Sequence, residues 1–278
     1  MKPGTIQREI LAVYERTGRG GARAPRGLNL EVGEALARRL GYAPEDLDAV
    51  PPPLLEAFVG AANLADRVDG PGPVADLGCG AGLEAWILAR RGHPVAALDA
   101  SGAMLRRLAG CLRGAPRLPL RPVRGLLPRL PFRADAFDWV LLNGAANLVP
   151  ERDELLREAV RVLRPGGWLL VADLVAVEPL PEGIRDLPEA WAWCVAGAES
   201  PERWTERLDR AGFASPRIEI LEPIPPLARA VIAARRFPPP PSPRPSPPEW
   251  EREADGRGLR AQGGPPAPGG WGGGGRGM

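Results

Sequence analysis

The sequence predicts an α/β protein with a mostly parallel sheet, helices on both sheet faces and an antiparallel hairpin near the end of the fold. Three observations lead to this prediction. From Val74 onward, short apolar segments alternate with helical segments, which is the pattern typical of a parallel sheet. The last two apolar segments follow one another with no helix between them. The chain has 278 residues and is 44% hydrophobic, so it can bury the core of one large domain or two small ones.

The first 69 residues predict a helical lid or extension. Apolar residues recur there at helical spacing, and the predicted helices cover residues 5–16, 30–42 and 54–68. A stretch rich in Gly, Arg and Pro at 18–27 predicts a loop after the first helix. Pro44 starts a short acidic turn before the third helix.

Residues 70–236 carry the alternating pattern of the main domain. The predicted strands are 74–77, 95–98, 120–124, 138–142, 168–173, 217–221 and 228–235. The predicted helices fall near 82–91, 101–112, 151–162, 187–197 and 200–211. The segment at 120–124 has the weakest strand pattern, and the last two strands form the predicted hairpin.

Residues 237–278 predict a disordered tail. This segment has 11 Pro and 11 Gly in 42 residues and few aliphatic side chains. Such a composition cannot bury enough surface to offset the entropy of the chain. Its PSPRPSPP stretch is compatible with polyproline II, so weak interactions of a Pro-rich tail with a partner stay open.

Charge and cysteine content narrow the class of protein. The 36 Lys and Arg nearly balance the 34 Asp and Glu, which gives a formal charge of +2 and no long-range attraction to nucleic acid or an anionic membrane. Cys79, Cys111 and Cys194 are too few and too scattered for a disulfide framework. The amino-terminal segment is charged and amphipathic, and no uncharged run is long enough to span a bilayer. We therefore expect a cytoplasmic protein without nucleic-acid or membrane partners.

The most informative segment is the glycine loop at 76–82, DLGCGAG. A predicted buried strand leads into Gly78, Gly80 and Gly82, and a helix follows directly. Glycine is needed where the chain turns sharply and where a ligand approaches the backbone. The second strand ends at Asp99, where a carboxylate can accept hydrogen bonds from a ribose diol.

The spacing of the glycines distinguishes between nucleotide ligands. A dinucleotide loop, G-x-G-x-x-G, would place its third glycine at Leu83, whereas this chain has G-x-G-x-G after Asp76. A carboxylate repels a pyrophosphate but attracts an ammonium group. S-adenosyl-L-methionine carries an ammonium group and a ribose diol and has no phosphate. The loop, Asp76 and Asp99 together favour this cofactor over a dinucleotide and over a purely structural turn.

Four segments resemble motifs of the class I S-adenosylmethionine-dependent methyltransferases over residues 70–236. They are DLGCGAG, LDASGAML around Asp99, LPFRADAFDWVLLNGAANL, and LREAVRVLRPGGWLLVADL with its Arg-Pro-Gly-Gly turn at 164–167. The resemblance implies a Rossmann-like seven-stranded sheet with a terminal antiparallel hairpin. The residues expected to bind the cofactor are Asp76, Gly78, Cys79, Gly80, Gly82, Asp99, Ala100, Leu126, Leu127 and Asn143. The glycines would meet its methionyl end, Asp99 its ribose, the backbone at 126–127 its adenine, and Asn143 would border the methionyl part.

The flanking segments are similar to arsenite methyltransferases. LGYAPEDLDAVP at 40–51 and the segment EGIRDLPEAWAWCVAGAESPERWTERLDRAGF at 182–213 carry this resemblance. It implies that Cys194 matches one arsenic-coordinating thiol of that family. However, Gly144 stands where those enzymes have a second cysteine, and no cysteine precedes Cys79. Trivalent arsenic is a soft ion that prefers a cluster of thiolates, so the predicted acceptor is a small molecule other than arsenite.

A further departure from the methyltransferase pattern lies at Leu126, where the family usually has an acid that bonds the adenine amino group. A leucine side chain cannot replace that bond. The resemblance therefore implies an adenine site that depends on backbone contacts.

Cys194 and Asp173 are the candidate catalytic residues. Asp173 is expected at the end of the fifth strand, where ligands of open α/β sheets bind, and either orients the acceptor, takes its proton or caps the next loop. Cys194 is a candidate because the resemblance to arsenite methyltransferases implies an arsenic-coordinating thiol there. The alternative is a thiol that only packs within the fold. Tyr14 either closes over the cofactor or packs within its helix. His93 is the sole histidine, so neither a histidine-built metal site nor a histidine triad is expected.

These observations predict a methyltransferase that acts on a small-molecule acceptor, with S-adenosyl-L-methionine as cofactor. Two alternatives stay open at this point. One is a true arsenite methyltransferase in which Cys194 works with external thiols such as glutathione. The other is a binding or regulatory protein that retains the cofactor fold without turnover.

Overall fold

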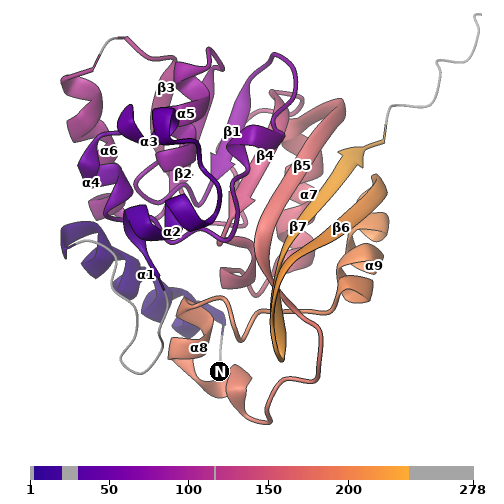
Figure 1. Cartoon of the computed structure of the whole chain (residues 1–278). Helices are drawn as coiled ribbons and strands as arrows, with labels where there is room; N and C mark the ends of the chain where they lie inside the picture. The colour runs from indigo at the N-terminus through magenta and orange to yellow at the C-terminus, as the bar shows by residue number, and fades with distance from the viewer. Residues whose placement is uncertain (1–2, 21–30, 116, 238–278) are drawn as a thin grey trace, which may run out of the picture. The chain divides into compact units, whose positions relative to one another are not determined.

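A computed structural model describes residues 3–20, 31–115 and 117–237. Its elements belong to one compact unit that runs from Met1 to Pro238 (Figure 1). The strands are β1 (Val74–Leu77), β2 (Val95–Asp99), β3 (Leu120–Arg124), β4 (Phe137–Asn143), β5 (Leu163–Ala176), β6 (Phe213–Ile224) and β7 (Leu227–Arg236). The α-helices are α1 (Pro3–Gly20), α2 (Gly33–Arg39), α3 (Pro44–Asp48), α4 (Pro52–Leu55), α5 (Leu83–Arg90), α6 (Gly102–Arg113), α7 (Arg152–Val162), α8 (Pro188–Ala192) and α9 (Pro201–Ala211). Short 3-10 turns are η1 (Ala65–Arg67), η2 (Ala146–Leu148) and η3 (Ile184–Asp186).

The strands form one seven-stranded sheet in the order β3-β2-β1-β4-β5-β7-β6. β1 is parallel to β2 and β4, and β7 is antiparallel to both β5 and β6. The predicted α/β fold, with a Rossmann-like, mostly parallel sheet and a terminal hairpin, is confirmed. The strand order reverses between β1 and β4, and open α/β sheets bind ligands at the carboxyl ends of the strands at such a reversal.

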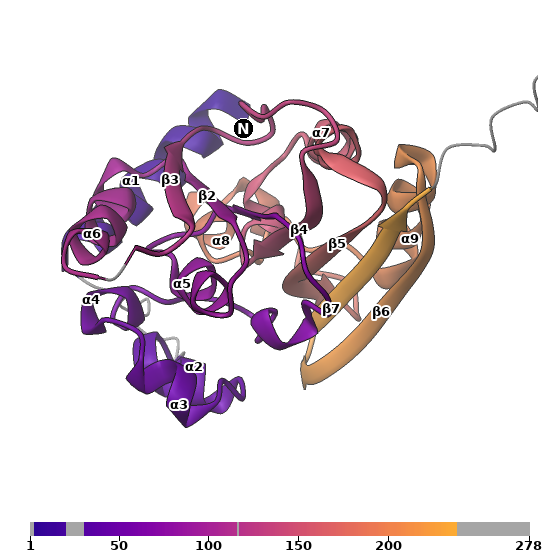
Figure 2. The same cartoon turned by 90° about the horizontal axis from the view of Figure 1, so that it is seen from above.

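Apolar side chains fill both faces of the sheet. On one face, α5 and the segment from α2 to η1 pack against the strands, with Leu54, Leu64 and Trp86 buried there. On the other face, α7 and α9 cover the sheet and bury Leu155 and Trp204. Figure 2 shows these layers from above. Both faces of a parallel sheet must be covered because its strands are apolar on both sides.

The predicted helix over 54–68 is wrong. The structure has only α4 and η1 there, and after Phe58, whose N–H still donates to the Leu55 carbonyl, backbone groups of the chain bond to distant side chains. The backbone N–H groups of Ala61 and Leu64 donate to Asn143 Oδ1 and Glu84 Oε1, each at 2.6 Å. The predicted helix at 187–197 is also shorter, because α8 ends at Ala192.

The edges of other predicted elements differ as well. α1 continues to Gly20, so residues 18–20 of the predicted loop are helical, and 21–27 lie outside the described residues. β5 begins at Leu163 and includes the predicted turn at 164–167, which bulges between the pairs Phe137–Leu163 and Trp139–Trp168. β5 also continues past Asp173, where it pairs with β7. Asp173 therefore lies within the strand and not at its end.

The predicted boundary between residues 69 and 70 stays a prediction, and the predicted tail, apart from Phe237, lies outside the described residues. Among the described helices, none is both long enough and apolar enough to cross a membrane.

Candidate cofactor and acceptor site

The glycine loop connects β1 to α5 and needs glycine for two different reasons. Gly78 has a φ of +73°, and a Cβ there would lie 2.5 Å from the Cβ of Ala145. Gly80 has a φ of +56°, and a Cβ there would meet no protein atom within 4 Å. The first glycine therefore permits close packing, whereas the second leaves free space beside the backbone.

Asp99, the last residue of β2, joins this loop to the start of α6. Its Oδ2 accepts a hydrogen bond from the N–H of Gly80 at 2.8 Å, and its Oδ1 accepts one from the N–H of Ser101 at 2.7 Å. Burial raises the pKa of Asp99 to about 6, although these backbone donors oppose the shift. The carboxylate is thus held in place at the end of the strand.

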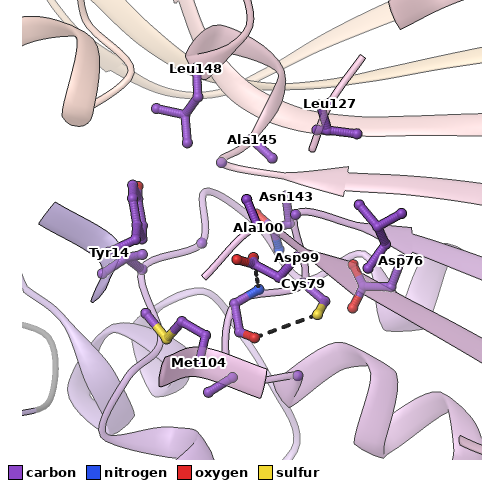
Figure 3. Close-up of a pocket in the computed structure, with 18 of the residues that line it drawn as sticks. Tyr14, Asp76, Cys79, Asp99, Ala100, Met104, Leu127, Asn143, Ala145 and Leu148 are labelled. Atoms are coloured by element: carbon purple, nitrogen blue, oxygen red, sulfur yellow. Dashed lines mark hydrogen bonds between the residues drawn. The ribbon is translucent and has the colours of Figure 1, made fainter. Parts of the chain in front are cut away.

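One cavity gathers the residues expected to bind the cofactor (Figure 3). It has an empty volume of about 1060 Å³, including its mouth. Its lining includes all ten: Asp76, Gly78, Cys79, Gly80, Gly82, Asp99, Ala100, Leu126, Leu127 and Asn143. Their role in binding stays a prediction, but the fold brings them to one place.

Three carboxylic acids line this cavity. Asp76 and Glu84 are buried, and burial raises the pKa of each. The nearby charges of Glu84 and then Asp99 add to the shift of the Asp76 pKa. Mutual repulsion of this kind is relieved by a cation, so the charges of the site fit an ammonium or sulfonium ligand. Within the described residues, no group of three or more Asp, Glu, His or Cys side chains is arranged to hold a metal ion.

Glu84 is a residue that the sequence reasoning missed. Its Oε1 accepts hydrogen bonds from the Tyr42 hydroxyl and the Leu64 N–H, each at 2.6 Å, while its buried Oε2 has no partner among the described residues. An acid within the otherwise apolar stretch LEAWILA was the available signal. An unsatisfied buried carboxylate oxygen beside a cavity suits a ligand that donates hydrogen bonds.

Asn143 ties the amino-terminal segment to β4. Its Oδ1 accepts from the Ala61 N–H at 2.6 Å, and its Nδ2 donates to the Ala62 carbonyl at 2.7 Å. The side chain lines the cavity, as expected, but its hydrogen bonds go to the protein. Asn143 therefore shapes the site by fixing residues 61–62.

The predicted adenine end is apolar. Met104 of α6 is fully buried and lines the cavity together with Leu127. The Leu126 side chain is 52% exposed and can offer no polar contact. Two apolar side chains can enclose a flat ring, so only the backbone at 126–127 remains to bond its polar edge.

Cys79 also lies on the cavity lining. Its thiol donates to the Gly80 carbonyl at 3.5 Å, and burial raises its pKa. The thiol is therefore held in the loop in its protonated form, as a packing group would be.

Asp173 and Cys194 lie outside the cavity lining, behind the segment that follows β4. Asp173 is 1% exposed, and its carboxylate accepts from the N–H groups of Asn147 and Leu174 at 2.9 and 2.8 Å. The buried Cys194 thiol donates to the Gly144 carbonyl at 3.3 Å. Burial, followed by the charge of Asp173, raises the pKa of this thiol. Both groups are engaged with the protein, and a catalytic role for either stays a prediction.

Tyr14 of α1 lines the cavity and faces Asp76 from its other side (Figure 3). Its hydroxyl donates to the Ala192 carbonyl of α8 at 3.3 Å. Burial raises its pKa well above the usual value, so this hydroxyl is a hydrogen-bond donor and not a base. Of the two sequence interpretations, contact with the cavity agrees with its position.

Comparison with known proteins agrees with this site. Residues 75–171 match the methyltransferase domain family. An arsenite methyltransferase of Halobacterium salinarum is 30% identical over 182 residues, which are 64% of this chain and 46% of the relative. A demethylmenaquinone methyltransferase of Mycobacterium tuberculosis is 31% identical over 181 residues, which are 56% of this chain and 73% of the relative. The crystal structure of an arsenic(III) S-adenosylmethionine methyltransferase from Chlamydomonas reinhardtii superposes with a TM-score of 0.58 at 25% identity and covers 69% of this chain and 72% of that one.

The chain belongs to the class I S-adenosylmethionine-dependent methyltransferases, and arsenite methyltransferases are among the proteins that it resembles. The match spans less than half the length of two curated arsenite methyltransferases, 46% of the Halobacterium salinarum protein and 42% of the human protein.

Proposed function

We propose that this chain transfers a methyl group from S-adenosylmethionine to a small-molecule acceptor that binds in the same cavity. The observation that supports this most is the lining itself. The loop glycines, Asp99 and an acidic cluster of Asp76 and Glu84 meet in one cavity, and their chemistry matches the ribose and the ammonium group of this cofactor. Residues 1–69 would act as a lid or extension over it.

The chain's own residues would position the reactants. The acids would neutralise the cofactor's positive charge, Asp99 would accept hydrogen bonds from its ribose, and α1 would limit the access of water. When bound, S-adenosylmethionine would supply an electrophilic methyl group and a sulfur that can take the electron pair of the bond to that methyl, while the acceptor would supply the lone pair of the new bond and lose its proton to water. Orientation of this kind supplies much of the rate in displacement reactions.

The test is calorimetric titration of the full chain with S-adenosylhomocysteine and with two phosphate-bearing nucleotides, ATP and NAD. We expect S-adenosylhomocysteine to bind, and ATP and NAD to bind at least 100-fold more weakly, because the carboxylates of the cavity repel their phosphate groups. Asp99→Ala should abolish the binding, and Asp48→Ala, at an exposed position that is not part of the lining, should leave it unchanged. Tight binding of ATP or NAD would contradict the proposal.

Arsenite is a second candidate acceptor, and one contact favours it. The Cys194 thiol meets the backbone of Gly144, so the two positions that carry thiols in the resemblance to arsenite enzymes are neighbours in space. Gly144→Cys should then create an arsenite site that includes Cys194. Gly144 has a φ of +66° and a Cβ there would lie 3.2 Å from the Val59 carbonyl, so Gly144→Ala is the control for strain. If Gly144→Cys binds arsenite no better than Gly144→Ala, the arsenite function loses its support.

A non-catalytic role is tested by the same preparation. It predicts that S-adenosylhomocysteine binds but that no acceptor in a broad panel is methylated.

We propose a cytoplasmic location, supported by three free thiols, since thiols stay reduced in that compartment. The proposed weak interactions of the Pro-rich tail concern residues outside those described.

A further inference from the structure

Part of the cavity is lined by apolar side chains that come from outside the glycine loop. Figure 3 shows Tyr14 and Leu148 across the cavity from Asp76. The wall is formed by Ile10, Leu11, Phe58, Val59, Leu148 and Val149, and we call these six residues the apolar wall. They come from α1, from the chain after α4 and from the chain around η2. None belongs to the glycine loop or to the ends of β1 and β2, which are expected to hold the cofactor, so we assign this wall to the acceptor.

The charges around this wall are of one sign. Among the described residues that line the cavity, no Arg, Lys or His occurs, and the charged side chains are Asp76, Glu84 and Asp99. Beside the wall, Gln7 and Tyr14 provide uncharged polar groups. An anionic acceptor would lose its hydration without gaining a partner and would be repelled by the carboxylates. The lining therefore selects against acceptors with a net negative charge, such as phosphates or simple carboxylates.

The lining is also poor in thiols. Cys79 is the only cysteine among the described lining residues, and its protonated thiol bonds the Gly80 carbonyl. Cys194 lies behind the wall and is bonded to Gly144. A soft metalloid that needs several thiolates has no such cluster here.

The helix that carries part of the wall, α1, is fixed to its neighbours by polar side chains. Gln7 Nε2 donates to Glu151 at 3.4 Å, Tyr14 donates to Ala192, and Glu15 accepts from the Ala103 N–H at 3.2 Å. Phe58 is packed edge-on against Tyr42 with ring centroids 5.5 Å apart. A wall anchored to α6, α7 and α8 has a defined shape, which is what a specific acceptor pocket requires.

We propose that the acceptor is an uncharged, largely apolar organic molecule whose body packs against the apolar wall. This inference rests on the proposed function, because it assigns the remaining part of the same cavity. The donors of Gln7 and Tyr14 are engaged with Glu151 and Ala192, but the Gln7 Oε1 and the Tyr14 hydroxyl oxygen could accept a hydrogen bond from the acceptor's polar end.

The test uses two ligands of the same ring and different charge. 2-Naphthol is neutral at pH 7 and 2-naphthoate is anionic, and equilibrium dialysis of each is made against the full chain saturated with S-adenosylhomocysteine, which fills the cofactor's part of the cavity. We expect 2-naphthol to bind at least 10-fold more tightly than 2-naphthoate. Equal binding of both, binding of neither, or displacement of 2-naphthol by arsenite with glutathione would overturn the inference.

A charge placed in the wall reverses this preference. Leu11→Arg should weaken the binding of 2-naphthol at least 10-fold and strengthen the binding of 2-naphthoate, because the guanidinium group would lie on the lining. Ala12→Arg is the matched control on the exposed side of the same helix and should change neither. If Leu11→Arg fails to fold, Leu11→Asn replaces it and should weaken 2-naphthol about threefold. Unchanged binding in the folded Leu11 variant would count against the wall.

Titration with S-adenosylhomocysteine alone separates the two proposals. If it binds and 2-naphthol does not, the acceptor inference fails and the cofactor site stands. If it does not bind, the proposed function fails, and dialysis without it still shows whether the wall selects the neutral ring.

Discussion

The pH dependence of cofactor binding tests the role of Asp99 directly. Its carboxylate already accepts from Gly80 and Ser101. The ionised form keeps a lone pair on each oxygen to accept from both hydroxyls of a ribose diol, whereas protonation turns one of these oxygens into a donor. Burial raises its pKa to about 6. We therefore expect the affinity for S-adenosylhomocysteine to fall as the pH falls through 6.

The size of the effect follows from the ionised fraction. At pH 5 about one Asp99 in eleven is ionised if its pKa is near 6, against nearly all at pH 7.5, and the apparent Kd rises in inverse proportion to the competent fraction. Binding should be about 10-fold weaker at pH 5. The same shift acts on stability with the opposite sign: the folded protein binds this proton more tightly than the unfolded chain, so the contribution of Asp99 to stability falls as pH rises from about 4 to about 6. Weaker binding at pH 5 would thus not be explained by unfolding through this group.

Asp99→Asn separates Asp99 from the other acids of the cavity. Loss of the charge-assisted hydrogen bonds costs about 2 kcal/mol, which is about 30-fold in Kd at pH 7.5. The variant should also lose most of the pH dependence between 5 and 7.5, measured by calorimetry, whereas Asp48→Asn should retain it. A wild-type affinity that is flat over this range, or an Asp99→Asn variant with the same pH profile as the wild type, would refute the reasoning.

Three further changes probe the loop, the acids and the core. Gly80→Ala and Gly41→Ala place a Cβ at positive φ with no protein atom within 4 Å, so each should lose about 1 kcal/mol in urea unfolding. Only Gly80→Ala should weaken the binding of S-adenosylhomocysteine, by 10-fold or more. Equal binding by the two variants would show that the Cβ at position 80 does not reach the ligand. Glu84→Gln should weaken S-adenosylhomocysteine about 10-fold and leave adenosine, which lacks the ammonium group, unchanged; a similar loss for both ligands would contradict an ammonium contact. Arg152 is buried, donates to two backbone carbonyls and lies 4.7 Å from the Trp204 ring centroid. Arg152→Met should destabilise the fold by about 3 kcal/mol and the exposed Arg203→Met by less than about 1 kcal/mol, measured by urea unfolding; similar losses in both would contradict the structural role of Arg152.

The order of the elements could be predicted from the sequence because each strand and helix of the sheet domain carries its own periodicity. β1, β2 and β4 are largely buried and appear in the sequence as short apolar runs. The starts of α7 and α9 are marked by polar residues and, in α9, by a proline in the first turn. The segment 54–68 could not be predicted in this way. Its apolar spacing is compatible with a helix, but its peptide groups bond to Asn143 and Glu84, which are distant in sequence.

The residues expected to bind the cofactor could be predicted because they belong to sequence motifs that many methyltransferases share. The glycines and Asp99 lie at strand ends, where the fold dictates both position and chemistry. Glu84 was missed because its role depends on a buried oxygen, Oε2, that has no hydrogen-bond partner among the described residues, and only a structure reveals this. Asp173 was placed at a strand end because its pairing with Ala230 of β7 comes from a strand more than 50 residues later in the chain.

The two halves of the cavity therefore carry different kinds of information. The residues that match the methyltransferase domain family, 75–171, supply the glycine loop, Asp99 and the adenine end. Four residues of the apolar wall, on α1 and at 58–59, lie before that match, and Leu148 and Val149 lie within it. The match to the methyltransferase domain family therefore supports mainly the cofactor half, because it places no constraint on the four wall residues outside it. The acceptor must be inferred from the charge, the thiol content and the shape of that wall, and these favour an apolar neutral molecule over arsenite.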